Sequence, residues 1–161
     1  MQDIEFDDSG YYTGPDLTDA LVAAAESHLG YRLPSSYLDV LRVRNGGTPL
    51  RRCCPTDFET SWAPDHFAIS AILGVGGDQG IDSTSGLGSP DLVREWGYPD
   101  VGVVICDTPS AGHDTVMLDY RACGPGGDPS VVYVDEDRVP RLVAPSFEAF
   151  IRRLFECPAD Y

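Results

Sequence analysis

Apolar residues recur at helical spacing near the start of the chain. The apolar positions between residues 16 and 29 fall on one face of a helix, with Thr18 as its N-cap and Gly30 at its C-terminal end. His28 lies on this apolar face, so we expect a buried, hydrogen-bonded histidine rather than a metal ligand. A second helix is predicted to follow, capped by Ser35. Its buried stripe consists of Tyr37, Val40 and Leu41.

The remainder of the chain combines strand-like runs with a final helix. An apolar run at 67–75 predicts a strand, and a short helix is expected at 91–96. Three further strands are predicted at 101–107, 114–120 and 130–135, where short Gly- and Pro-containing connections favour antiparallel pairing. The last helix has Ser146 as its cap and the stripe Phe147, Phe150, Ile151, Leu154 and Phe155. This order predicts an α+β domain, in which an N-terminal helix pair and a C-terminal helix pack on a largely antiparallel sheet.

Two segments interrupt the pattern. Residues 48–66 contain three prolines and no period, and residues 76–90 are rich in glycine and serine. We interpret both as irregular insertions in a single domain spanning residues 1–161, and we expect the second to be a mobile surface loop. Its glycines do not form a dinucleotide-binding motif, because Gln79 occupies the place of the third glycine in GxGxxG.

The chain is strongly acidic. It has 26 acidic residues against 11 arginines, no lysine, and a net charge of -15. The absence of lysine excludes a Walker A phosphate loop and Schiff-base chemistry. Residues 53–100 carry eight acidic residues and one arginine. Such a field repels nucleic acid and anionic lipid and attracts basic proteins, although acidity that only keeps the protein in solution would give the same composition.

Neither a membrane span nor a disulfide framework is predicted. The longest apolar run, at 67–75, is about half of the ~20 residues that cross a bilayer, and the first residues lack the features of a secretion signal. We therefore expect a soluble, cytoplasmic protein. The five cysteines include the adjacent Cys53 and Cys54 and show no CxxC spacing. We expect reduced, mostly structural thiols and no metal or other cofactor.

Four candidate catalytic side chains, Asp107, His113, Asp114 and Asp119, lie within thirteen residues, a density that metal hydrolases also show. In an extended strand His113 and Asp119 are about 20 Å apart, too far to share one ion. Asp107 and Asp114 can approach across a hairpin, but carboxylates are also the commonest residues of turns. We expect no catalytic residue. A metal-dependent hydrolase that uses Asp107, His113 and Asp114 is the weaker alternative.

The sequence resembles the SUKH superfamily, which includes fungal cell-wall synthesis regulators and bacterial immunity proteins of polymorphic toxin systems. The matching stretches are ESHLGYRLPSSYLDVLRVRNGG at 26–47, GHDTVMLDY at 112–120, VVYVDED at 131–137 and SFEAFIRRL at 146–154. The resemblance implies a helix pair, a sheet and a final helix. It also implies a protein that acts by binding other proteins, without a catalytic motif.

Resemblance and acidity together predict a non-enzymatic protein that neutralises a cognate toxin, for example a basic nuclease, through an acidic surface. The alternative is a regulatory interaction module with no toxin partner. Because binding residues are often placed on loops, the candidate contacts lie in the two irregular segments. They are Asp57, Glu59, Trp62, Asp65, Asp78 and Asp82. Trp62 packed under its own loop is the competing interpretation, and the alternative places for the interface are the sheet and the region around Asp135, Glu136 and Asp137.

Overall fold

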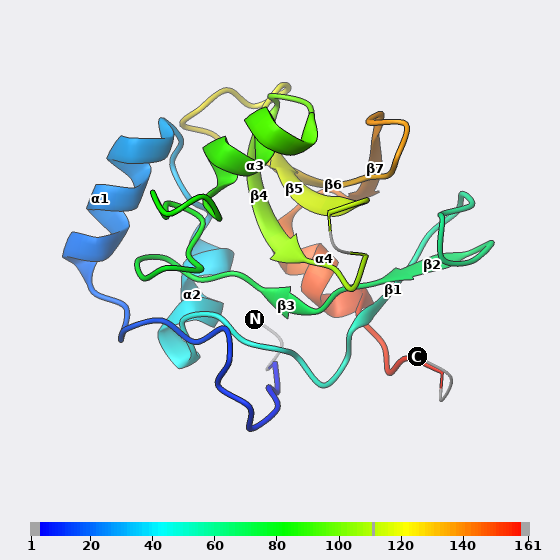
Figure 1. Cartoon of the computed structure of the whole chain (residues 1–161), viewed down its shortest axis with the longest axis horizontal. Helices are drawn as coiled ribbons and strands as arrows, with labels where there is room; N and C mark the ends of the chain where they lie inside the picture. Colours follow the sequence, from blue (N-terminus) through cyan, green and yellow to red (C-terminus); the bar gives the residue numbers. More distant parts are fainter. Residues whose placement is uncertain (1–3, 111, 159–161) are drawn as a thin grey trace.

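The computed structural model describes residues 4–110 and 112–158, and an antiparallel sheet forms its centre (Figure 1). Within these residues, five strands lie in chain order across this sheet: β3 (Ala71–Ile72), β4 (Gly102–Asp107), β5 (Thr115–Asp119), β6 (Ser130–Val134) and β7 (Pro140–Ala144). A separate pair, β1 (Cys53–Pro55) and β2 (His66–Ala68), is also antiparallel. The connections between β4, β5 and β6 are short and give the antiparallel pairing that the sequence predicts.

The described part of the chain forms four helices around the sheet: α1 (Asp19–Leu29), α2 (Ser35–Val43), α3 (Ser89–Trp96) and α4 (Phe147–Arg153). The predicted caps of α1 and α4 are confirmed, because Thr18 accepts a hydrogen bond from the backbone of Leu21 and Ser146 accepts one from that of Ala149. The predicted cap at Ser35 is wrong, since α2 already begins at this residue. The α+β class is confirmed.

The hydrophobic core lies where α2 and α4 meet the sheet. The predicted stripe residues Leu41, Phe150 and Leu154 are at most 5% exposed. The rings of Tyr37 and Phe147 pack edge to face with centroids 5.2 Å apart, and the Tyr37 hydroxyl donates a 2.6 Å hydrogen bond to the carbonyl of Leu73. All residues of β5 are buried, so both faces of the sheet are covered at its centre.

Several expectations fail where tertiary contacts override local pattern. His28 is exposed, because α1 lies at the edge of the molecule and fully buries only Ala25 (Figure 1). The apolar run 67–75 contributes to two strands, β2 and β3, rather than one. The segment 48–66 is not wholly irregular, since it contains β1. The edge strand β7 has no counterpart among the predicted elements.

The glycine-rich segment 76–90 is fixed from within. Ile81 is fully buried, so the expectation of a surface loop is wrong at this residue, and its backbone N–H donates to the carbonyl of Gly74 at 2.9 Å. The Asp82 carboxylate accepts a 2.8 Å hydrogen bond from the backbone of Gly76. The buried amide of Asn45 holds the residue directly before this segment, because it donates to the carbonyl of Val75 and accepts from the Val75 N–H, and it also donates to the carbonyl of Pro15.

A disulfide between Cys53 and Cys157 joins β1 to the segment after α4 and corrects the expectation of reduced thiols. The two cysteines are 104 residues apart, so their spacing along the chain gave no sign of pairing. Backbone bonds between Cys53 and Phe155, at 2.8 and 3.1 Å, hold the same two segments together. Cys54 and Cys106 are buried free thiols, and burial raises the pKa of Cys54 to about 12, which makes it unreactive.

Candidate functional site

Two acidic segments meet at one end of the sheet. They are the β1–β2 loop, residues 56–65, and the β6–β7 turn, residues 135–139, and we call them together the acidic end (Figure 1). The backbone N–H of Ser61 donates a 2.8 Å hydrogen bond to the carboxylate of Asp135, which joins the two segments. The acidic end holds one arginine, Arg138, and the carboxylates of Asp57, Glu59, Asp65, Asp135, Glu136 and Asp137.

The carboxylates of Asp57 and Glu59 are the least compensated of this group. Both residues are exposed, and neither side chain makes a hydrogen bond or ion pair with the described residues. Asp65 is exposed as well, but it lies 2.8 Å from the ring nitrogen of His66. A cationic group of another protein could therefore pair with Asp57 and Glu59 without breaking a contact in this one.

The β6–β7 turn is more fully paired. Asp137 forms a 2.7 Å ion pair with Arg141, and the hydrogen bond from this guanidinium holds the pKa of the carboxyl below its usual value. Glu136 lies 3.7 Å from the ring of His113. Exposed ion pairs of this kind contribute little to stability. A partner that displaced them could therefore bind the carboxylates of the turn at small cost to the stability of this protein.

The buried carboxylate of Asp114 anchors the acidic end to the sheet. Its carboxylate is 1% exposed and accepts hydrogen bonds from the hydroxyls of Thr108 (2.6 Å), Ser110 and Tyr133 and from the indole N–H of Trp62 (2.7 Å). These donors come from the β4–β5 connection, β6 and the β1–β2 loop, so one buried side chain joins three parts of the structure. Burial and the bond to Asp114 raise the pKa of Tyr133 far above its usual value. Asp114 therefore has a structural role in the β4–β5 connection, as the sequence predicts, and this role is that of a buried anchor.

Trp62 has a structural contact of its own. Its side chain is half-buried, packs against the core, and donates to Asp114 as described above. This agrees with the competing interpretation, in which the indole supports its loop. Its expected part in binding a partner stays a prediction, and so does that of the other candidate contacts.

Asp78 and Asp82 lie apart from the acidic end. The segment that carries them faces the N-terminal residues 12–15 across a shared pocket, on the α1 side of the molecule (Figure 1). Asp78 is exposed, and no described residue bonds to its carboxylate, whereas the Asp82 side chain is engaged with Gly76. The structure thus separates the six candidate contacts into two groups.

The residues of the alternative hydrolase site make separate contacts. Asp107 accepts a 2.6 Å hydrogen bond from the hydroxyl of Tyr12, Asp114 is surrounded by its four donors, and His113 is exposed beside Glu136. Within residues 4–110 and 112–158, no group of three or more His, Cys, Asp or Glu side chains is placed to hold a metal ion.

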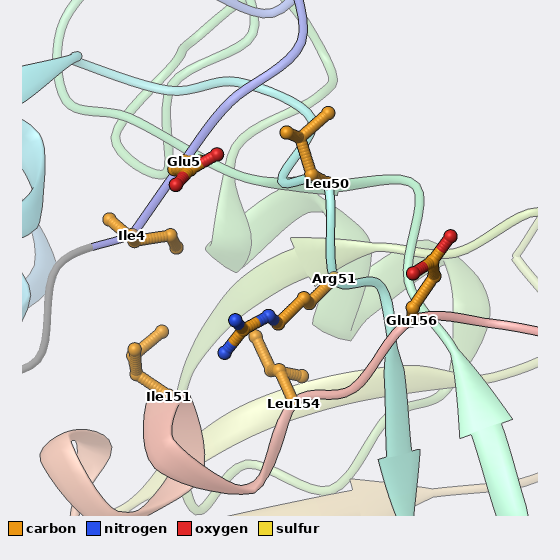
Figure 2. Close-up of a pocket in the computed structure, with 7 residues that line it drawn as sticks. All are labelled: Ile4, Glu5, Leu50, Arg51, Ile151, Leu154 and Glu156. Carbon is orange, nitrogen blue, oxygen red and sulfur yellow. The ribbon is translucent and has the colours of Figure 1, made fainter.

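A cavity of about 360 Å³ lies near both chain ends (Figure 2). The side chain of Arg51 extends over an apolar floor formed by Ile151 and Leu154, and the carboxylates of Glu5 and Glu156 stand at the sides. No sequence pattern marked this cavity, because its lining comes from the N-terminal segment, the segment before β1, α4 and the segment that follows α4. Its two acids and one arginine give it no strong preference for an anion or a cation.

These features define an α+β domain with an acidic end built on loops that are anchored to the sheet. The chain matches the SMI1 / KNR4 family (SUKH-1) over residues 16–153, and it belongs to this family. The match extends from just before α1 to the end of α4 and confirms the SUKH resemblance. No curated protein matches the chain. Among the described residues, no helix is both long and apolar enough to span a bilayer.

Proposed function

We propose that this chain is a non-catalytic binding protein that neutralises a cognate toxin by covering a basic surface with its acidic end. Family membership supports the binding class, because the SUKH superfamily includes immunity proteins. The observation that carries the proposal is the acidic end itself. It presents Asp57 and Glu59 as exposed carboxylates without partners among the described residues, on a loop anchored by Ser61 and Trp62.

Electrostatics and loop anchoring would act at different stages of binding. A net charge of -15 steers a basic protein toward this chain and raises the rate of encounter, an effect that salt screens. The anchored loop lowers the conformational entropy lost on association, which favours a long-lived complex. The same charge opposes binding to nucleic acid or an anionic membrane. We further propose a cytoplasmic location, where an immunity protein would meet its toxin, and there the Cys53–Cys157 disulfide would be an exception to the rule that cytoplasmic thiols stay reduced.

The test measures association and dissociation rates between this protein and a toxin domain, which is sought first in the reading frames that neighbour its gene. Neutralising the loop in the double variant Asp57→Asn, Glu59→Gln should slow association about threefold to tenfold at low salt. The difference from the wild type should shrink as salt rises, because screening weakens steering. Dissociation should change less, since the rim charges act mainly before contact.

The matched control is the double variant Asp16→Asn, Asp128→Asn. It removes the same formal charge from exposed carboxylates without bonding partners among the described residues. Asp128 lies in the β5–β6 connection, at the opposite end of the strands from the β6–β7 turn. Equal slowing in both double variants, or rates independent of salt, would place the interface away from the acidic end. Tight binding to a basic protein that is not a toxin would favour the regulatory alternative.

A further inference from the structure

A second cavity of about 290 Å³ lies beside the acidic end, between α3 and the β4–β5 connection. Its lining is unusually aromatic. We call it the aromatic cleft, and the residues that matter here are Tyr11, Tyr12, Leu87, Trp96, Tyr98 and Asp107. No arginine or histidine of the described chain lines it. The cleft thus combines π faces with negative charge.

Large apolar side chains at its mouth are left open to solvent. Tyr11 is 69% exposed, Leu87 49% and Trp96 45%, and within the described chain these are three of only seven large apolar side chains that are exposed. The Trp96 ring rests on Gly112, whose positive φ of 97° and missing Cβ allow this close approach. Exposed apolar groups gathered at one cavity are a feature of binding sites.

Asp107 supplies an acceptor inside the cleft. One oxygen of its carboxylate accepts the hydrogen bond from Tyr12, and the other has no partner among the described residues. No described side-chain nitrogen or oxygen is both buried and without a partner, so this second oxygen reaches solvent. Asp114 also borders the cleft, but its carboxylate is already engaged by four donors. Asp107 is therefore the group that can receive a cation.

We propose that the aromatic cleft receives an arginine side chain of the basic protein partner. The guanidinium would stack on Trp96 and Tyr11 and donate to the free oxygen of Asp107. Arginine fits better than lysine, because its planar guanidinium stacks on rings and still presents N–H donors at its edge. The identity of the partner as a basic protein rests on the proposed function. The recognition of a guanidinium group rests on the cleft alone.

Arg138 does not line the cleft, but it shows that a guanidinium stacks on Tyr98, one of the aromatic rings of the cleft. Its central carbon lies 4.6 Å from the ring centroid of Tyr98, while its nitrogens donate to the carbonyls of His113 (2.7 Å) and Gly112 (3.4 Å). Because Arg138 belongs to the β6–β7 turn, the cleft and the acidic end adjoin. One partner surface could cover both, with an arginine inserted beside the charged loop.

The test uses a small probe and does not need the partner. N-acetylarginine amide is titrated into the protein while the indole N–H resonance of Trp96 is followed by NMR, with N-acetylcitrulline amide as the neutral analogue of similar shape. The Trp96 resonance should shift in a saturable way with the arginine probe and not with the citrulline probe. Asp107→Asn should weaken the affinity about tenfold and Trp96→Leu, followed on Gly112, about threefold.

Matched controls separate local from general effects. Asp107→Asn keeps an oxygen that can accept the Tyr12 hydroxyl, and Trp96 is exposed, so both variants should fold. Asp128→Asn removes one charge at the other end of the strands and should leave probe affinity unchanged. Equal affinity for N-acetyllysine amide or the citrulline probe, or no loss in Asp107→Asn, would overturn the proposal. Such a failure would not refute the proposed function, because toxin binding by the acidic end is tested separately through its salt-dependent association rates.

Discussion

Replacing Asp114 by alanine should destabilise the protein by about 3 kcal/mol. The change leaves four hydrogen-bond donors without their acceptor, but the hydroxyls of Thr108 and Ser110 lie 2.9 Å apart and can bond to each other. The indole of Trp62 and the hydroxyl of Tyr133 lose their acceptor, at about 1 to 3 kcal/mol each. Part of this loss is offset, because a buried charge without a cationic partner among the described residues is removed as well.

The conservative variant Asp114→Asn should cost only about 1 kcal/mol. Its amide oxygen can face Trp62 and Tyr133, which only donate here, and its NH₂ group can face the two hydroxyls, which can rotate to accept.

Thermal unfolding followed by circular dichroism measures both variants. For a chain of this size about 1 kcal/mol corresponds to about 2 to 4 °C, so the alanine variant should unfold about 6 to 12 °C below the wild type. Asp78→Ala, which removes an exposed carboxylate with no bonding partner in the described residues, is the control and should stay within about 0.5 kcal/mol. An alanine variant as stable as this control, or an asparagine variant as unstable as alanine, would refute the role of Asp114 as an anchor.

Three further predictions concern stability. Phe150→Ala should lower the free energy of unfolding by about 3 to 5 kcal/mol in urea denaturation, because the ring is fully buried, and an unchanged midpoint would contradict the assigned core. Breaking the Cys53–Cys157 bond with a reductant should lower stability by about 2 to 4 kcal/mol, as expected for a link across 104 residues, and a midpoint indifferent to the reductant would show that the bond does not constrain the unfolded chain. Burial raises the pKa of Asp119, but hydrogen bonds from Arg121 outweigh this effect and lower the pKa. Above the unfolded pKa of about 3.9 the Asp119 carboxylate therefore stabilises the folded protein. This contribution is lost as the pH falls through the lower folded pKa. Arg121→Ala should therefore reduce the loss of stability on acidification, measured as the unfolding midpoint against pH, and an unaltered acid profile would argue against this linkage.

The helices and the pairing of the main strands could be predicted because they depend on neighbouring residues. Period and cap place Ser146 and Phe150 correctly, since a helix buries its own apolar stripe whatever it packs against. The same rule fails for His28, because α1 lies at the edge and only a narrow part of its stripe reaches the core. Periodicity does not show how much of an apolar stripe packs against the rest of the fold.

The candidate site could be predicted only in pieces. The sequence marks Asp57 and, as an alternative, the region 135–137, but the bond that joins them connects Ser61 and Asp135 across 74 residues. The sequence places Asp114 at the mouth of a hairpin but cannot show that it is an anchor, because its indole donor lies 52 residues away. Likewise, the aromatic cleft brings Tyr11 and Trp96 together from distant parts of the chain. Contacts of this range have no local signature.

Anchoring and presentation are divided between different side chains of the β1–β2 loop. Trp62 and Ser61 hold the loop to the sheet, while Asp57 and Glu59 carry charge and make no bond with the described residues. If the proposed function holds, substitutions of Asp57 and Glu59 would change the charge that the loop offers to a partner without changing where the loop lies. Single substitutions at these positions can therefore match the charge of the loop to a partner whose surface has changed. The fold and the stability of this protein stay the same.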